Sequence, residues 1–364
     1  MQEVKKKRSA AIYSGVLVIY MGEDLMQNFY QLTPAQQAER FAELARQAIT
    51  RWDIAEDADL VLLKHRENAV FRVQEPESGQ KVILRIHRFN YHSDPDLRSE
   101  LQWMQVLHRD GIPTPSVLPS SQNNLFEVVA CEAVPEPRQC DVLSFIEGQQ
   151  LGSIEGAGKE NIQELLSNYR LVGALTARLH NHASTWDVPA AFSRHAWDED
   201  GLVGERPFWG RFWELPALTS EQRQVLLSAK SAVREQLHTF GKSRDRYGMI
   251  HADLLPENLL IGRNGLCLID FDDAGFGWYV FDIATSLFFH VGEAYFAALK
   301  QAYLAGYESE RPLPRAHVEM LEVFLLARGF TYLGWCYTRS ETEMAQQLTP
   351  LLAARVTEMA SAWL

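Results

Sequence analysis

The chain has 364 residues, a length that suits two ordinary domains or one large bilobal domain. Hydrophobic residues make up 46% of the chain and charged residues 23%, which excludes a disordered, collagen-like or multi-span membrane protein. The formal net charge of −12 argues against a general nucleic-acid binder, which needs positive charge to contact phosphates. The four cysteines form no C-x-x-C pair, so we expect reduced thiols in a cytoplasmic protein.

The N-terminus carries a basic stretch, residues 5–8, followed by an apolar one, residues 10–21. This order resembles the start of a secretory signal. Twelve residues are too few to span a bilayer as a helix, and no small-x-small cleavage site follows. We therefore interpret residues 1–32 as an extension that is flexible or that results from a start assigned too early, with Met21 and Met26 as later candidate starts.

Residues 33–147 have the pattern of a small sheet with one inserted helix. The spacing of apolar residues predicts a helix over 33–49, and Asp94-Pro95 opens another that ends near residue 108. Strand-like runs cover residues 60–64, 69–74, 81–87, 125–131 and 141–145.

Residues 148–364 are mainly helical in pattern. Long helices are expected over 161–182 and 219–240, and everything after residue 280 is again helical. Two short strands are expected over 258–261 and 265–271. The change from strand-like to helical patterns near residues 145–150 divides a β-rich part of the chain from an α-rich part.

The chemically informative segment surrounds Asp253. Asn258 lies five residues further on, where a strand begins, and Asp270 ends the next strand. If these strands pair as a hairpin, Asn258 and Asp270 lie close together and offer hard oxygen ligands suited to Mg²⁺. Asp253 can then accept the proton of an attacking hydroxyl, as phosphoryl transfer requires. The alternative, that Asp253 and Asn258 cap turns, leaves the second half of the pattern unexplained.

The joint motif is H-x-D-L-x-x-x-N over residues 251–258, followed by I-D-F over residues 269–271. It resembles the catalytic and metal-binding loops of the protein-kinase-like fold. Ala252, where protein kinases usually carry Arg, makes it more similar to the small-molecule branch, the aminoglycoside phosphotransferase and choline kinase family, which includes a bacterial homoserine kinase type. The resemblance covers roughly residues 55–345.

The resemblance implies an α+β, bilobal protein-kinase-like fold that uses ATP and Mg²⁺. Residues 33–147 would form a small β-rich, nucleotide-binding N-lobe, and residues 148–364 a larger α-helical C-lobe with the catalytic loop and the acceptor site. The resemblance also implies that Asp253 is the catalytic base and that Asn258 and Asp270 bind magnesium. It implies that His251 shapes the catalytic loop and that Asp282 is a structural Asp that braces this loop.

The same resemblance requires a cation for the nucleotide phosphates and a Glu to hold it. Strand alternation puts Ile83 and Arg85 on one face, and Glu100 lies fifteen residues after Arg85 in the following helix. The family typically has Lys at this position, and an Arg fork is not interchangeable with it. Arg88 and Lys81 are the rival cations, and a surface Arg on an edge strand is the alternative for Arg85.

Three further residues receive nucleotide-site roles by resemblance. Asn68 is either a phosphate-side contact or a simple turn residue, and Phe145 and Ile146 match the linker whose backbone faces the adenine. His180 and His182 near a helix end are expected to meet the last carbonyls rather than a metal. No Walker or dinucleotide-binding glycine motif occurs, which disfavours a P-loop or Rossmann protein.

The predicted function is transfer of the γ-phosphoryl group of ATP to a hydroxyl of a small molecule: an amino alcohol, a homoserine-like compound or an aminoglycoside. Asp272 and Asp273 add negative charge beside the metal ligand and favour a cationic acceptor, unless magnesium or backbone capping occupies them. The aromatic segment 208–213 either packs in the core or lines the acceptor site.

Two alternatives remain open on the sequence. A stress-response Ser/Thr protein kinase is disfavoured because no Ala-Pro-Glu follows Asp270. A nucleotide-binding pseudokinase is disfavoured because the three residues of the catalytic motif are intact. Neither a nucleic-acid partner nor a membrane partner is expected, and a homodimer is one open quaternary state.

Overall fold

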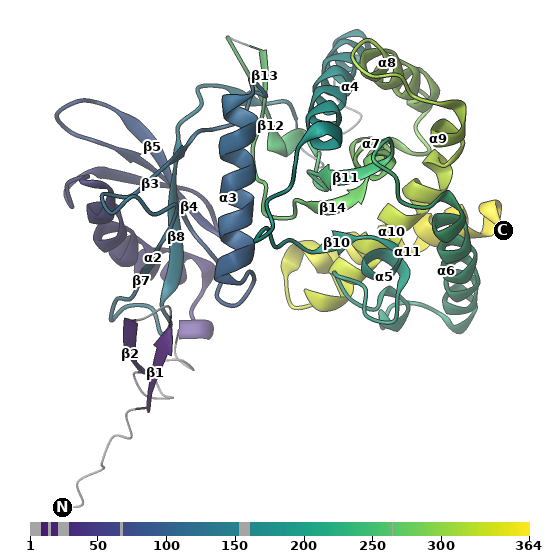
Figure 1. The fold of residues 1–364 in the computed structure, drawn as a ribbon. Helices are drawn as coiled ribbons and strands as arrows, with labels where there is room; N and C mark the ends of the chain where they lie inside the picture. Colours follow the sequence, from purple (N-terminus) through teal and green to yellow (C-terminus); the bar gives the residue numbers. More distant parts are fainter. Residues whose placement is uncertain (1–8, 14–15, 21–28, 66–67, 153–160, 264) are drawn as a thin grey trace, which may run out of the picture. The chain divides into compact units, whose positions relative to one another are not determined.

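A computed structural model describes residues 9–13, 16–20, 29–65, 68–152, 161–263 and 265–364 (Figure 1). The chain forms two compact units. Unit 1 comprises Met1–Arg109 and Thr114–Glu147, and unit 2 comprises Asp110–Pro113 and Gly148–Leu364. In the described parts of the chain, no helix is both long enough and apolar enough to cross a membrane.

Unit 1 holds most of the strands. Its described elements are β1 (Ser9–Tyr13), β2 (Val16–Tyr20), α2 (Pro34–Ile49), the 3₁₀ helix η1 (Thr50–Trp52), β3 (Asp59–His65), β4 (Ala69–Gln74), β5 (Lys81–Ile86), α3 (Asp94–Arg109), β6 (Val117–Leu118), β7 (Glu127–Val129) and β8 (Arg138–Ser144). The predicted helices are confirmed, and Thr33 starts α2 with a capping box in which Gln36 takes part.

The sheet of unit 1 has the order β3-β4-β5-β8-β6, with β7 also paired to β8. Val82, Leu84 and Ile86 of β5 alternate onto one face and join the buried core with residues of α2. Arg85 lies on the opposite face, where it contacts α3. The sheet therefore separates an apolar core from a charged cluster.

Two predicted strands of unit 1 differ in their bounds. The strand expected over 125–131 is β7, which covers only Glu127–Val129, and the strand expected over 141–145 begins earlier, as β8 at Arg138. The reason is that β7 and β8 pair with each other, Val129 opposite Arg138, on both sides of a turn. The two-residue strand β6 was not predicted.

The N-terminal extension is partly structured. β1 and β2 pair antiparallel, Ser9 opposite Tyr20. Phe29 is buried and packs edge-on against Phe41 of α2, so the packed part of unit 1 begins before residue 33. The flexibility predicted for residues 1–32 falls largely on residues outside the described ones.

Unit 2 is mainly helical. Its described elements are β9 (Gln149–Gln150), α4 (Ile162–Thr185), β10 (Ala196–Trp197), α5 (Glu199–Val203), η3 (Phe212–Glu214), α6 (Ser220–Phe240), β11 (Tyr247–Ile250), η4 (Pro256–Asn258), β12 (Leu259–Gly262), β13 (Gly265–Leu268), β14 (Gly275–Trp278), α7 (Tyr279–Leu287), η5 (Phe288–His290), α8 (Phe296–Glu308), α9 (Arg315–Glu319), α10 (Leu321–Thr338) and α11 (Glu343–Trp363). The long helices were predicted, whereas the short strands β10, β11 and β14 were not.

Helices α4 and α8 lie side by side in unit 2 (Figure 1). Two glycines allow this close approach. A Cβ on Gly173 would come within 2.1 Å of the Tyr303 carbonyl oxygen, and a Cβ on Gly306 within 1.9 Å of the Arg170 carbonyl oxygen. Any larger residue would push the two helices apart. The pair supports the loop that precedes β12, because His180 of α4 reaches that loop through Asp282.

Candidate active site

The hairpin β12–β13 of unit 2 brings Asn258 and Asp270 together, as predicted. The strands pair antiparallel with Leu259 opposite Leu268, and the Ile269 N–H donates to the Asn258 carbonyl at 3.0 Å. Asn258 directly precedes β12 and Asp270 lies two residues past the end of β13, so the pairing of the two strands brings these residues close together.

Asp282, at the first turn of α7, holds the loop that precedes the hairpin. Its carboxylate accepts hydrogen bonds from the backbone N–H groups of His251, at 3.0 Å, and Ala252, at 2.7 Å. Ala252 and Asp270 both adopt left-handed backbone conformations, with φ of 64° and 65°. Such conformations cost free energy in non-glycine residues and persist only where surrounding contacts fix them. Asp282 provides such contacts at Ala252.

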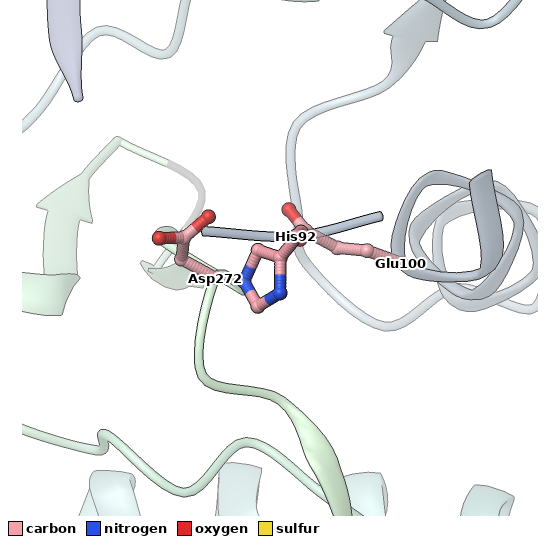
Figure 2. A group of neighbouring side chains, drawn as sticks. All are labelled: His92, Glu100 and Asp272. Carbon is pink, nitrogen blue, oxygen red and sulfur yellow. The ribbon is translucent and has the colours of Figure 1, made fainter. Parts of the chain in front are cut away.

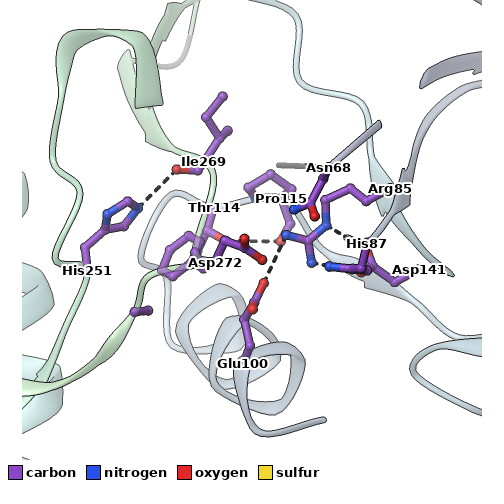
Figure 3. Close-up of polar contacts among 12 residues, drawn as sticks. Asn68, Arg85, His87, Glu100, Thr114, Pro115, Asp141, His251, Ile269 and Asp272 are labelled. Carbon is purple, nitrogen blue, oxygen red and sulfur yellow. Dashed lines mark hydrogen bonds and ion pairs between the residues drawn. The ribbon is translucent and has the colours of Figure 1, made fainter. Parts of the chain in front are cut away.

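His251 connects the two loops of the site. Its Nε2 lies 3.0 Å from the Ile269 carbonyl oxygen (Figure 3), and its Nδ1 accepts from the Asp253 N–H at 3.3 Å. His251 and Asp282 therefore make the contacts expected of a loop-shaping His and a structural Asp.

The interpretation of His180 as a helix-end residue is wrong. Helix α4 continues to Thr185, so His180 lies inside it and is fully buried. Its Nδ1 lies 2.9 Å from the Tyr307 hydroxyl, and its Nε2 lies 3.1 Å from the Asp282 carboxylate. Burial lowers the pKa of His180, which favours the neutral ring. His180 thus supports Asp282.

Asp253 is held from two sides. The Asn258 side-chain nitrogen donates to Asp253 Oδ2 at 2.7 Å and to the Asp253 backbone oxygen at 2.9 Å. Arg328 of α10 donates from Nη2 to Asp253 Oδ1 at 2.9 Å. Both donations use the Asn258 nitrogen, so its side-chain oxygen is the atom that suits a cation. Asn258 fits a metal-ligand role on that ground.

Arg328 was not predicted as part of the site. It stands in α10, where most positions are buried and apolar. A charged residue in a helix that is apolar on all sides is rarely buried without a partner. The single Arg in this apolar stretch was therefore the sequence signal that could have indicated a buried ion pair.

Several carboxylates lie close together in the loop after β13. Asp272 is buried, and its side chain is labelled in Figure 2. Burial, together with the neighbouring charges of Asp253 and Asp272, raises the pKa of Asp273 to about 8. A divalent cation relieves such repulsion, and carboxylate and amide oxygens are the ligands that Mg²⁺ prefers. The donor set of this loop therefore fits a divalent metal.

The backbone of the same loop is held by basic and aromatic side chains. Arg194 donates to the carbonyl oxygens of Asp272, at 2.5 Å, and Ala274, at 2.6 Å. Trp197 Nε1 donates to the Asp273 carbonyl oxygen at 2.8 Å. These contacts use the main-chain oxygens of Asp272 and Asp273.

In unit 1, the expected ion pair between Arg85 and Glu100 is confirmed. Arg85 Nη1 lies 3.0 Å from Glu100 Oε1, and Glu100 projects from α3 (Figures 2 and 3). Asp141 is a second partner that sequence reasoning missed. It accepts from Arg85 Nε and Nη2, both at 2.9 Å, because β5 and β8 pair with Arg85 opposite Asp141.

His87 completes this charged cluster of unit 1. Its Nε2 lies 2.5 Å from Asp141 Oδ2 (Figure 3). Burial raises the pKa of Asp141, but Arg85 and His87 together outweigh that effect and lower it. Asp141 therefore stays ionised, and two buried carboxylates hold the Arg85 fork.

The rival cations of unit 1 have other surroundings. Lys81 lies 3.9 Å from Glu147 and 5.5 Å from the centre of the Phe145 ring, and Arg88 is exposed. Asn68 Oδ1 accepts from the Arg88 N–H at 3.0 Å, which joins the residue before β4 to the segment after β5. Phe145 and Ile146 are half-buried and follow the end of β8.

The aromatic segment 208–213 packs mainly in unit 2. Phe212 is buried and stacks on Phe330 with ring centres 4.4 Å apart. Trp209 is also buried, and its ring lies 4.9 Å from the Arg328 guanidinium. Phe208 is the more exposed member, at 37%. The packing interpretation holds for Phe212 and Trp209.

The comparisons with known proteins agree with this geometry. The phosphotransferase enzyme family model matches residues 59–316. Amicoumacin kinase from Bacillus subtilis is 25% identical over 305 residues, 80% of this chain and 83% of that protein. A homoserine kinase from Sinorhizobium medicae is 30% identical over 258 residues, 68% of each chain. A microcompartment-associated aminopropanol kinase matches in structure with a TM-score of 0.77 at 30% identity, over 88% of this chain and 97% of that one.

The matched residues include the whole of the 251–273 segment, so the resemblance stated on the sequence motif is confirmed. The similar proteins named above are kinases of small molecules, which favours that activity over a protein kinase or a pseudokinase. The chain belongs to the phosphotransferase enzyme family, has its protein-kinase-like fold, and transfers a phosphoryl group from ATP to the hydroxyl of a small molecule.

Proposed function

We propose that this kinase uses ATP with Mg²⁺ and phosphorylates the hydroxyl of an amino alcohol. Asp253 is the catalytic base, and Asn258 and Asp270 are the magnesium ligands. The observation that carries the assignment is the orientation of Asn258, whose nitrogen holds Asp253 at 2.7 Å while its oxygen is left to face a cation. The metal, when bound, neutralises charge on the phosphates.

The base assignment follows from how Asp253 is held. Its side chain is 19% exposed, so an acceptor hydroxyl can reach it. Two donors fix the carboxylate, and a positioned carboxylate can take the hydroxyl proton as the new O–P bond forms and the bond to ADP breaks.

The nucleotide role of unit 1 rests on Arg85. Glu100 and Asp141 fix its guanidinium, and we propose that this fixed cation contacts the phosphates of ATP. Phe145 and Ile146 are proposed to offer backbone groups to the adenine. For Asn68, the hydrogen bond to the Arg88 backbone favours a supporting role over a direct phosphate contact.

The acceptor class follows from charge and from the relatives. Asp272 and Asp273 place carboxylates beside the proposed metal ligand Asp270, and such a field attracts a cationic acceptor. Two of the similar proteins are named as kinases of aminopropanol and homoserine, which both carry a hydroxyl and an amine. ATP as donor and four free cysteines fit a cytoplasmic location.

A substrate panel with matched controls tests the acceptor class. Turnover of ATP is measured with 1-amino-2-propanol, ethanolamine, choline and homoserine, each beside the alcohol that lacks the amine. We expect activity with at least one amine and none with its control. Asp273→Asn should raise the KM for that amine more than the KM for ATP, and added salt should also raise it. A preference for a net anion would contradict the acceptor class.

A further inference from the structure

Arg328 on α10 is a buried arginine aimed at the proposed base. We propose that Arg328 is a positioning residue for phosphoryl transfer, which fixes the Asp253 carboxylate so that it receives the acceptor proton. This inference rests on the assignment of Asp253 as the base, and it adds a residue that the sequence motif does not include.

The contact is direct and well formed. Arg328 Nη2 lies 2.9 Å from Asp253 Oδ1 and 3.0 Å from the Tyr332 hydroxyl. Asn258 donates to the other carboxylate oxygen of Asp253 at 2.7 Å. With one donor on each oxygen, the plane of the carboxylate is set from both sides, and charge-assisted hydrogen bonds of this kind are the strong ones.

The surroundings of Arg328 are aromatic. The side chain is fully buried, and its guanidinium carbon lies 4.9 Å from the Trp209 ring, 5.5 Å from the Phe281 ring and 4.3 Å from the Tyr332 ring. Burial opposes the charge, but the Tyr332 hydroxyl and Asp253 raise the pKa of Arg328. The residue is therefore a cation in an apolar enclosure.

This arrangement is poor for stability, which is why it points to function. Among the residues that the structure describes, Arg328 Nε and Nη1 have no hydrogen-bond partner although both are buried, and unpaired buried donors destabilise the folded state. Replacing a whole buried ion pair by apolar residues of similar size is often neutral or stabilising, so a buried pair is weak evidence for a stabilising role. Since stability does not explain Arg328, the gain must lie in what it touches, the carboxylate of Asp253.

The rings also explain why Arg328 can position Asp253 accurately. Trp209, Phe281 and Tyr332 come from three separate parts of unit 2 and restrict the guanidinium on several sides. A clamped donor loses little freedom when it binds, so it holds the carboxylate in one orientation. A small misplacement of a catalytic group can lower the rate many-fold.

The experiment is a double-mutant cycle between Arg328→Met and Asp253→Asn. Turnover is measured with the best acceptor of the panel above and, independently, as ATP hydrolysis with water as the acceptor. We expect Arg328→Met to lower kcat about 10–100-fold, as loss of a charge-assisted hydrogen bond predicts. The KM for ATP should change less than about two-fold, because Arg328 acts on the base and not on the nucleotide.

The cycle separates positioning from a general structural effect. In the Asp253→Asn background, Arg328→Met should change turnover less than about three-fold, because its target is gone. The melting temperature of each variant is measured alongside, so that the loss of stability expected when one partner of a buried ion pair is removed is separated from the loss of turnover. Arg339→Met is the charge-matched control: Arg339 lies just after α10, 5.4 Å from the Trp335 ring, and should leave kcat unchanged.

The outcomes are distinct. Wild-type kcat in Arg328→Met, or equal losses in both backgrounds, overturns the positioning role. If Asp253→Asn itself keeps full turnover, the base assignment fails, and that result is separate from the first. If Arg328→Met does not fold, Arg328→Lys keeps the charge but not the planar fork, and its cycle with Asp253→Asn is interpreted in the same way.

Discussion

Buried acidic groups behave in opposite ways in the two units. In unit 1, Asp141 faces Arg85 and His87, and these partners hold its pKa below the usual range. In unit 2, burial and the charges of Asp253 and Asp272 raise the pKa of Asp273 to about 8. In the first cluster the cations outweigh burial, whereas in the second the charge of Arg328 does not outweigh burial and the neighbouring carboxylates. The contrast teaches that unit 1 presents a fixed protein cation, while unit 2 presents ligands suited to a metal ion.

The largest expected effect is a loss of turnover caused by a change in unit 2 alone. Asp253→Asn removes the proposed base but keeps the shape of the side chain, so turnover should fall about 10²–10⁴-fold. ATP should still bind, because Arg85 and the proposed metal ligands are unchanged. Steady-state kinetics with a nucleotide-binding titration check this. Turnover near the wild-type value would remove the proposed mechanism.

The second prediction removes one of the carboxylates that compensate the buried cations of unit 1. Asp141→Asn leaves Arg85 and His87 with one buried carboxylate fewer, and breaking a buried ion pair destabilises by about 3–5 kcal/mol. Because the folded pKa of Asp141 is lowered, its stabilisation is present above about pH 4 and is lost as pH falls through the folded value. Urea unfolding from pH 2 to 7 measures this.

The outcome that would contradict this second prediction is a variant as stable as the parent at neutral pH. Arg72→Met is a suitable control in the same sheet, because Arg72 pairs with Asp59 at the surface and such pairs contribute little.

The third prediction concerns the orientation of the phosphate cation. Arg85→Ala and Glu100→Ala should each raise the KM for ATP about ten-fold, as loss of a charged contact implies. The double variant should lose less than the product of the two, because both remove one contact. Additive losses would instead point to Arg88 or Lys81 as the cation.

The smallest expected effect tests the crowding in unit 2. The folded pKa of Asp273 lies above its unfolded value near 4, so its contribution to stability is present at low pH and is lost as pH rises toward 8. Asp273→Asn should therefore be more stable than the parent at pH 8, by on the order of 1–3 kcal/mol because the side chain keeps some exposure. Urea unfolding with a chelator present gives the difference. Equal slopes against pH in both proteins would contradict the crowding.

The sequence allowed the local parts of both sites to be predicted. The hairpin that joins Asn258 to Asp270 and the spacing of Arg85 and Glu100 depend on short-range periodicity, which a single sequence carries. Asp141 was missed because its pairing with Arg85 depends on strand register over a long chain separation. Arg328 was missed because its contact with Asp253 depends on how α10 packs, and no local pattern specifies that.

The central claim is that Asp270 and Asn258 hold magnesium while Asp253 does not. The most direct measurement is calorimetric titration of ATP with and without magnesium against the parent, Asp253→Asn and Asp270→Asn. The account predicts that Asp253→Asn keeps the magnesium dependence of binding while turnover is lost. Asp270→Asn should remain folded and lose that dependence. Equal magnesium dependence in Asp270→Asn and the parent, or its loss in Asp253→Asn, would contradict the account.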